Sequence, residues 1–426
     1  MALFILALYI TIIFIRPMDW WGPLYELPIV NNLALLLIPS SFLGATKESV
    51  GRWLRLPELW LALFVLIGAS MSSFFIWLGG VIFIFQEFGK VILCYAVILL
   101  VVRQEKGFRF ILWTIFLCAA WMAFNGILQI QTGYGFGDSV PLWRSEYNVF
   151  QIRAFGIFND PNDLCLVFIL VLPLLYSEFR VASNAVIKWS AFALMPLMIT
   201  AVWLTNSRGG IMGIFGMVVG YAILKTKGIK RWISILVPGM IISIFAPSRF
   251  SSQQSGVDIG RVDAWGIGLK EFLHHPIFGI GYGYFTEIAD GKVAHNSYVH
   301  ALTEMGLVGY MPWFILIFMT MTHLCRAINL NSSIQRKDQF YLIGLFSALS
   351  GYLTSIYFLS RCYNYVLYIL LALALSKVAI AANNSGKYEE IFGNKQADLK
   401  KSVIATFISI FIIYGTVRLA NLMGGR

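Results

Sequence analysis

Apolar residues along this chain come in long runs that are separated by short polar or basic segments. Many of the runs approach the roughly 20 residues that an α-helix needs to cross the hydrocarbon core of a bilayer. The alternating segments of roughly ten residues that are typical of an outer-membrane β-barrel are absent. The pattern therefore predicts membrane-spanning helices over residues 2–15, 28–43, 57–78, 88–102, 108–130, 163–179, 187–205, 210–224, 232–246, 297–325, 339–359, 363–382 and 403–419.

Composition supports the same class of protein. Hydrophobic residues make up 58% of the 426 residues and charged residues 12%, whereas a soluble domain carries about 25% charged residues. We expect an all-α, polytopic integral membrane protein of about 12–13 transmembrane helices, forming a single transmembrane domain over residues 1–426. The first apolar run lacks a preceding basic segment and a small-residue cleavage site, which favours a retained helix over a signal peptide. The five cysteines lie in or beside apolar runs without metal-ligand spacing, so we interpret them as small hydrophobic residues.

Basic residues decide the predicted orientation. The net charge of +11 comes from short clusters between apolar runs, a pattern that disfavours nucleic acid as a partner. Loops rich in Lys and Arg stay on the cytoplasmic side of a membrane. With a cytoplasmic N-terminus, alternation of the spans places five such clusters on that side: Lys47/Arg52/Arg55, Arg103/Lys106/Arg109, Lys225/Lys227/Lys230/Arg231, Arg326/Arg336/Lys337 and Lys387/Lys395/Lys400/Lys401. The side on which the C-terminus lies is left open.

The remaining polar segments then fall outside the cytoplasm. Two of them are sizeable external loops, at residues 131–162 and 247–294, and we expect the second to be the main catalytic loop. This loop and the start of the next span hold four of the five histidines: His274, His275, His295 and His300. Polar residues concentrated beside apolar helices predict a functional site there.

Six arginines lie on the predicted external side, against the positive-inside trend: Arg144, Arg153, Arg208, Arg249, Arg261 and Arg361. An arginine at a helix end can simply reach lipid headgroups. Arg208, however, precedes two glycines at a helix start, where free backbone N–H groups also favour an anion. Arg261 lies in the catalytic loop with aromatic residues and histidines close behind it. A guanidinium stays charged and matches oxyanion geometry, so Arg208 and Arg261 are candidates for binding phosphate.

His295 is the candidate general base. It precedes Asn296 and Ser297, which are favourable N-cap residues, and an unperturbed imidazole titrates near pH ~6.5, which suits proton transfer. The alternative is a histidine that only hydrogen-bonds the loop, and His274 and His275 offer a second pair of imidazoles. The histidine spacings fit no standard zinc pattern, so no metal is expected.

Three further features have a structural and a functional interpretation. The run Asn159-Asp160-Pro161-Asn162 is typical of a turn and a helix start, and its amides also suit sugar hydroxyls. The glycine run at 279–283 lacks the flanking strand of a phosphate-binding loop, so it is interpreted as a flexible turn. Glu304 lies inside an apolar span, where a carboxylate is a functional candidate unless it pairs with a neighbouring helix.

Taken in order, the short motifs of this region resemble those of the O-antigen ligase superfamily, which includes O-antigen ligases, O-antigen and exopolysaccharide polymerases and bacterial O-linked oligosaccharyltransferases. The motifs are Phe-Asn-Asp-Pro-Asn at 158–162, Ser-Arg-Gly-Gly at 207–210, Gly-Arg-x-x-x-Trp at 260–265, His-x-Pro-x-x-Gly-x-Gly at 274–281, and His-Asn-Ser-Tyr with Glu-x-Gly-x-x-Gly at 295–309. Each motif is short, so the resemblance rests on their order and their shared external placement, from about residue 156 to residue 309.

The resemblance implies an undecaprenyl-diphosphate-linked glycan as donor and an acceptor hydroxyl, with no metal and no cofactor. It implies that His295 activates the acceptor hydroxyl and that Arg208 and Arg261 hold the donor diphosphate. Asn159 and Asn162 match the Pro-Asn block of the superfamily. Further candidates for contacting the glycan are Arg153, Asn296, Tyr298 and Arg361.

The expected function is a metal-independent membrane glycosyltransferase whose active site faces the periplasm at the bacterial inner (cytoplasmic) membrane. Its acceptor would be lipid A-core for an O-antigen ligase, or another lipid-linked unit for an O-antigen or exopolysaccharide polymerase. A protein O-oligosaccharyltransferase is one alternative. A lipid-linked sugar flippase or transporter is another, but transporters often use paired repeats with ionisable residues near the midplane. This chain instead places its arginines at one face and shows no repeat. The other expected partner is membrane lipid, and no nucleic acid is expected.

Overall fold

A computed structural model of the chain describes residues 1–25, 27–43, 45–76, 78–145, 148–226, 230, 255–330 and 332–423. This part of the chain is almost entirely helical. Its α-helices are α1 (Ala2–Ile15), α2 (Ile29–Phe42), α3 (Lys47–Leu54), α4 (Pro57–Ile76), α5 (Leu78–Val101), α6 (Glu105–Thr132), α7 (Pro161–Val181), α8 (Ala185–Leu204), α9 (Arg208–Lys225), α12 (Ser255–His274), α13 (Phe285–Ile288), α14 (Ser297–Asn329), α15 (Arg336–Ser355), α16 (Tyr365–Ser385), α17 (Tyr388–Phe392) and α18 (Lys395–Met423). Two short antiparallel strands, β1 (Leu142–Arg144) and β2 (Val149–Gln151), form a hairpin between α6 and α7.

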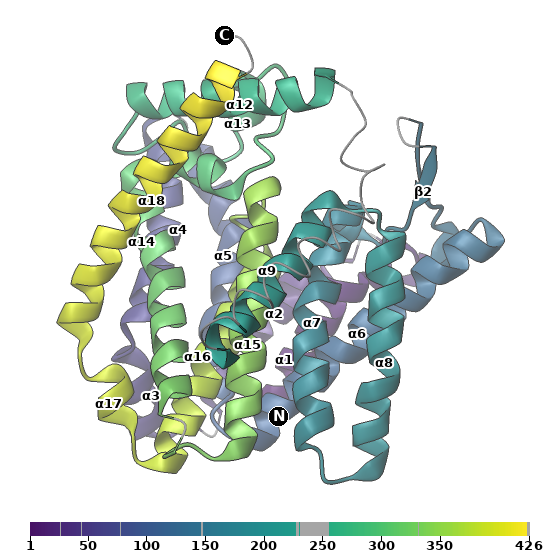
Figure 1. Cartoon of the computed structure of the whole chain (residues 1–426), viewed down its shortest axis with the longest axis vertical. Coiled ribbons are helices and arrows are strands. Elements are labelled where there is room, and N and C mark those ends of the chain that lie inside the picture. The colour runs from purple at the N-terminus through teal and green to yellow at the C-terminus, as the bar shows by residue number, and fades with distance from the viewer. Residues whose placement is uncertain are drawn as a thin grey trace.

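The long helices stand side by side in one bundle, and α12 lies across one end of it (Figure 1). Within the described residues, 11 helices are long and apolar enough to cross a membrane. The number rises to 12 if α2 and α3, which are bent by 118° relative to each other, count as one span. The predicted all-α polytopic class is confirmed. The span expected at 232–246 lies outside the described residues.

Two predicted boundaries change in the structure. Helix α5 begins at Leu78, so the span predicted to start at residue 88 was too short: polar Gln86 and Glu87 lower the local hydropathy without interrupting the helix. The segment expected to be the main external loop, 247–294, contains α12 and α13. Its first residues, 247–254, lie outside the described part.

Side-chain caps explain where several helices of the bundle begin. The carboxylate of Asp160 accepts from the backbone of Asn162 at 2.8 Å at the start of α7, and Ser207 accepts from Gly210 at 3.0 Å at the start of α9. Asn184 and Asn364 act in the same way for α8 and α16. A free N–H group is costly in a low-dielectric environment, so these caps fix the helix ends at defined residues.

Glycines bring α9 unusually close to α15. Three glycines of α9 face hydroxyl residues of α15, and a Cβ at any of them would overlap its neighbour: Gly213 with Ser355, Gly216 with Thr354 and Gly220 with Ser350. Small residues at such an interface let two helices pack closely in a membrane, where the hydrophobic effect does not drive association. The contact fixes the start of α9, which carries Arg208, beside the end of α15.

The glycine run at 279–283 is a packed crossing rather than a flexible turn. Helix α14 is broken at Gly306, which has φ +56°. The backbone N–H groups of Ile280 and Gly281 donate to the carbonyls of Thr303 and Glu304, each at 3.0 Å. On the other side of the break, Leu307 and Val308 donate to Pro276 and Ile277 at 2.9 and 3.0 Å. The segment from Pro276 to Gly281 therefore replaces hydrogen bonds that the broken helix lacks.

The bundle has two chemically different ends. We call the end where α7, α9, α14 and α16 begin the site end, and α12 lies across it at the top of Figure 1. We call the other end, where α4, α6, α15 and α18 begin, the charged end. There Lys395 donates to the carbonyl of Arg55 at 3.1 Å, and Arg326 pairs with Asp398 of α18. The predicted basic clusters around Arg55, Arg326 and Lys395 therefore share one end.

Candidate active site

Three helix starts and one turn meet at the site end. The starts belong to α7, α9 and α14, and the turn joins α15 to α16 at residues 359–364. Ser207, the cap of α9, donates to the side-chain oxygen of Asn162 at 2.6 Å, and this bond joins α9 to α7. The carbonyl of Gly209 accepts from Ser355 at 2.9 Å, which joins α9 to the end of α15. Asn162 and Arg208, far apart in sequence, thus lie in one cluster.

Arg361 lies at the centre of this cluster. Its guanidinium pairs with the buried Asp163 at the start of α7 and lies 3.6 Å from the Asp160 carboxylate. Its backbone N–H donates to Ser297 at 2.7 Å, and the Ser297 hydroxyl donates to the carbonyl of Leu359 at 2.5 Å. Burial lowers the pKa of Arg361, but the two carboxylates raise it more, so the pKa lies above its ordinary value. Arg361 therefore ties α7 to α14 as a permanent cation.

His295 lies immediately before α14 in a constrained conformation. Its φ of +48° falls in the left-handed region, which is uncommon for a residue with a side chain. On one side, the carbonyl of Ala294 accepts from the Trp265 indole at 2.6 Å. On the other, Asn296 caps α14 by accepting from the backbone of Tyr298 and Val299 at 3.0 and 3.2 Å. Strain of this kind is typical of functional positions, and both neighbours hold the partly buried His295 at the edge of the cluster.

Helix α12 is fixed against the same point. Besides the Trp265 contact, the hydroxyl of Thr303 donates to the carbonyl of Gly268 at 3.0 Å. Arg261 is four residues before Trp265, about one helical turn away. Its backbone belongs to α12, whereas its side chain lies outside the described residues.

The other predicted glycan contacts differ in their placement. Asn159 is exposed beside the cluster, one residue before the Asp160 cap. Arg153 lies in the α6–α7 connection, where its guanidinium donates to the carbonyl of Val140 at 2.8 Å, away from the contacts that hold the cluster together. Tyr298 packs inward, since its hydroxyl donates to the carbonyl of Leu353 at 3.1 Å. Of these residues, Asn159 alone adjoins the cluster with an exposed side chain.

The remaining histidines of the region separate into two environments. His274 and His275 are exposed at the end of α12, where His274 lies 3.9 Å from Glu271. His300 is one turn inside α14, and its Nε2 lies 3.0 Å from the carboxylate of Glu304. The same carboxylate accepts from the backbone of Gly283 and Phe285 at 2.9 and 3.2 Å. Glu304 thus anchors the glycine-rich crossing below His295.

The cluster contains residues to which the motifs alone assign no role in the site. Asp163, Ser207 and Ser297 hold the helix starts together, and each makes its contact with a residue at least 45 positions away. Asp163 directly follows the Asn159–Asn162 block, and this position beside a motif was the only sequence feature that could have pointed to it as a site residue. Its partner could not be read from the sequence.

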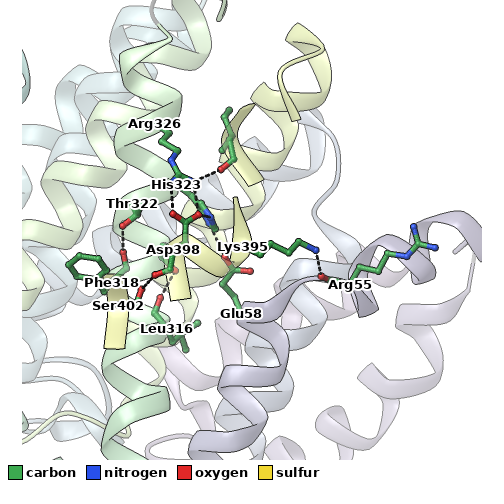
Figure 2. A network of polar contacts seen from close by, with 12 residues as sticks. Arg55, Glu58, Leu316, Phe318, Thr322, His323, Arg326, Lys395, Asp398 and Ser402 are labelled. Atoms are coloured by element: carbon green, nitrogen blue, oxygen red, sulfur yellow. Dashed lines mark hydrogen bonds and ion pairs between the residues drawn. The ribbon is translucent and has the colours of Figure 1, made fainter. Parts of the chain in front are cut away.

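A second ionic cluster lies at the charged end and includes the fifth histidine. Figure 2 shows His323 of α14 between Glu58 of α4 and Asp398 of α18, with its two ring nitrogens 2.8 and 3.6 Å from their carboxylates. Arg326 binds the same Asp398 and donates to the carbonyl of Ile391 at 3.0 Å. His323, Glu58 and Asp398 are each at most 2% exposed. This network joins three helices at the end opposite His295.

Lys377 makes a parallel arrangement nearby. Its fully buried ammonium pairs with Glu105 of α6 and lies 2.7 Å from Asp338 of α15. The rings of Phe108 and Tyr341 lie 5.1 and 4.7 Å from the same nitrogen. Oppositely charged side chains at the charged end therefore join neighbouring helices.

Comparison with known proteins agrees with the motifs. A family described as O-antigen ligase matches residues 193–314, which run from α8 to the middle of α14 and include Arg208, Arg261 and His295. The Asn159–Asn162 block and Arg361 lie outside this range. None of the curated proteins matches the chain. The family match confirms the resemblance of this chain to the O-antigen ligase superfamily.

Proposed function

We propose that this protein is a membrane glycosyltransferase that transfers a glycan from undecaprenyl diphosphate to an acceptor hydroxyl at the periplasmic face of the bacterial inner membrane. The observation that carries the proposal is the meeting of the α7, α9 and α14 starts around His295 and Arg208. Backbone N–H groups at helix starts and arginine side chains favour bound phosphate. An imidazole at the same place suits proton transfer.

In the proposed reaction the acceptor oxygen forms a bond to the anomeric carbon of the donor glycan. The bond from that carbon to the diphosphate oxygen breaks, and undecaprenyl diphosphate leaves with the electron pair. The acceptor proton passes to the imidazole of His295. Arg208 and Arg261 would stabilise the negative charge that develops on the leaving diphosphate, and we propose on this basis a metal-independent transfer.

The contacts around Arg361 assign it a positioning role in this scheme. Its guanidinium is engaged by Asp163, Asp160 and the carbonyl of Ser360 at 2.7 Å, so its fork is already occupied. A guanidinium used in this way aligns the starts of α7 and α14. We therefore propose Arg208 and Arg261, rather than Arg361, as the diphosphate ligands.

The test is transfer by the purified full-length protein in lipid nanodiscs, supplied with an undecaprenyl-diphosphate oligosaccharide. One arm adds lipid A-core, and the other contains the lipid-linked unit alone. Product that forms only with lipid A-core identifies an O-antigen ligase, and a ladder formed without it identifies a polymerase. Transfer should fall steeply in Arg208→Ala and stay near wild type in Arg144→Ala, an arginine of β1 that bonds Gln151 at 3.1 Å. Absence of transfer in both arms would contradict the proposal.

A further inference from the structure

A cavity of about 390 Å³ opens beside the cluster, on the side of α5. It falls within the range of roughly 300–1,000 Å³ that is usual for small-molecule sites. Its polar end is formed by Asp163, Ser360 and Arg361, and its apolar wall by Phe88 and Val91 of α5. A second cavity of about 240 Å³ lies beyond Tyr282, which lines both. We call the two together the α5 groove.

Aromatic rings follow one another along the α5 groove. The ring centroid of Tyr282 lies 6.0 Å from that of Phe83 and 4.7 Å from that of Tyr363. Tyr363 in turn lies 5.1 Å from Phe88. Such rings pack well on the C–H face of a pyranose, while a few placed polar groups take its hydroxyls.

Two polar groups of the groove are candidates for contacting a ligand. The hydroxyl of Ser360 is buried and has no hydrogen-bond partner among the residues that the structure describes. Buried polar atoms nearly always have a partner, so a ligand hydroxyl is a natural one. Glu87 is half exposed within a membrane-spanning helix, where an ionisable residue is a functional candidate by default. Its contact with Lys90, at 3.3 Å, leaves its second oxygen available.

The charges of the groove disfavour a phosphate or a uronic acid. Its ionisable lining consists of Glu87, Asp163 and Arg361 in the larger cavity and Glu287 in the smaller one. Arg361 pairs with Asp163 and Glu87 pairs with Lys90, but the lining itself holds three carboxylates and one cation, so its own charge is net negative. Like charges repel strongly in such a site. This charge disfavours the diphosphate of the donor and favours a neutral sugar.

The groove and the start of α9, which carries Arg208, lie beside different helices. Helix α9, which carries Arg208, packs against α7 and α15, whereas α5 packs against α4 and α16. The side chain of Arg361 lines the groove. Its backbone N–H donates to Ser297 at the start of α14, next to His295. Two reactants that meet at His295 would approach it from these two sides.

We propose that the α5 groove binds a neutral sugar of the acceptor glycan, with Tyr282 as its stacking platform and Glu87 as the carboxylate that excludes acidic sugars. This assignment rests on the proposed glycan transfer, because it identifies the groove with the acceptor. Binding of a sugar can nevertheless be measured without any transfer, and the two proposals can therefore fail separately.

The binding test is saturation-transfer NMR on the full-length protein in nanodiscs, which avoids maltoside detergents that themselves carry sugar. The probes are methyl glucoside, methyl N-acetylglucosaminide and methyl glucuronide. We expect saturation of the two neutral glycosides and none of the glucuronide, with the neutral signals lost in Tyr282→Ala and kept in Tyr134→Ala, an exposed tyrosine outside the groove. Equal signals in Tyr282→Ala would overturn the proposal.

A gain of binding guards against a variant that merely misfolds. Glu87→Lys should admit methyl glucuronide, because the change replaces the repelling carboxylate by a cation. The matched change Glu48→Lys, at a carboxylate that is 79% exposed on α3, should not. A glucuronide that stays unbound in Glu87→Lys would contradict the role given to Glu87.

Steady-state transfer separates the acceptor from the donor. Tyr282→Ala should raise the KM for the acceptor at least tenfold and leave the KM for the lipid-linked donor within about twofold, the former corresponding to about 1.4 kcal/mol. A rise in the donor KM instead would place the donor glycan in the groove and overturn the acceptor assignment. Sugar binding in the NMR test without any transfer by the wild type would contradict the proposed function and keep the groove as a sugar site.

Discussion

The two ends of the bundle use charged residues in opposite ways. At the site end, Arg361 and its partner Asp160 are 25% and 38% exposed, and Arg361 borders a cavity. At the charged end, Lys377 and Glu58 are fully buried, and each contacts a polar side chain of another helix: Lys377 contacts the carboxylate of Glu105, and Glu58 contacts the imidazole of His323. The first arrangement leaves polar groups within reach of a ligand, and the second uses them to join helices. A buried charge in a membrane protein is therefore informative about function only together with the space around it.

Helices α14 and α18 are among those that connect these ends. Helix α14 carries Ser297 and His300 at the site end and His323 at the charged end. Helix α18 begins at the Asp398 network and packs against α12, which holds the residue before His295. The comparison predicts that substitutions at the site end reduce turnover and that substitutions at the charged end reduce stability. If a substitution at one end also changed the property assigned to the other, the connecting helices would be the elements that transmit the change.

The largest effect is expected for His295→Ala. Loss of a general base typically costs a factor of 10² to 10⁴, so kcat should fall about a thousandfold, or about 4 kcal/mol. The unfolding midpoint should change little, because the backbone at this position is held by its neighbours Ala294 and Asn296. The measurement is glycan transfer in nanodiscs alongside denaturation in mixed micelles. His274→Ala, at the exposed end of α12, is the comparison, and a larger loss there would move the base to that residue.

The next effect belongs to the charged end. Asp398→Ala leaves the buried His323 and the partly exposed Arg326 without their shared carboxylate, and such a loss costs about 3 kcal/mol of unfolding free energy. The kcat of the folded fraction should stay near wild type. Glu48→Ala removes an exposed carboxylate 3.7 Å from Arg52 and is expected to cost less than about 0.5 kcal/mol.

A parallel fall in kcat and stability in Asp398→Ala would break the comparison. It would mean that α18 transmits the change to α12, and the same fall should then appear in Arg326→Ala. SDS titration with transfer assays on the same samples distinguishes the two cases.

Arg361→Lys is expected to have an intermediate effect on both properties. A lysine keeps the charge, but its ammonium cannot bond Asp163, Asp160 and the Ser360 carbonyl as the guanidinium fork does. The loss should be about 2 kcal/mol of stability, together with a fall in kcat, because α7 and α14 lose alignment. Arg180→Lys, an exposed arginine near the end of α7 that bonds Tyr176 at 2.6 Å, should change neither. If Arg361→Lys lowers only stability, Arg361 has no positioning role in the reaction.

Much of the fold was accessible from hydropathy and from helix-capping residues. The long apolar runs predicted the membrane-spanning class. The Asn159–Asn162 run and Asn296 marked the starts of α7 and α14, where Asp160 and Asn296 accept from free N–H groups. The start of α5 was missed because hydropathy averages over Gln86 and Glu87, which the helix accommodates. Glu87 also lines the α5 groove. The polar residue that misled the hydropathy-based prediction of α5 is therefore also a candidate ligand contact.

The site was accessible only as a set of residues. The motifs gave His295, Arg208 and Arg261, but pairing Asp163 with Arg361 requires knowledge of how helices 198 positions apart pack. The glycine motifs were also difficult to interpret. Gly279 and Gly306 have φ of +70° and +56° and lie in backbone contact across the break in α14. Both positions therefore require glycine, and neither motif shows this requirement by itself.

The smallest effect provides the closest test of the comparison, because the same chemical change can be made at both ends. Ser207→Ala and Asn184→Ala each remove a helix cap, and each should cost about 1 kcal/mol of unfolding free energy. Ser207 also bonds Asn162 and precedes Arg208, so its loss should lower kcat several-fold and raise the KM for the lipid-linked donor. Asn184 begins α8 at the charged end and should leave both constants unchanged. Equal kinetic losses in the two variants would show that turnover follows overall stability, and the division of the bundle into a reactive and a structural end would then have no kinetic basis.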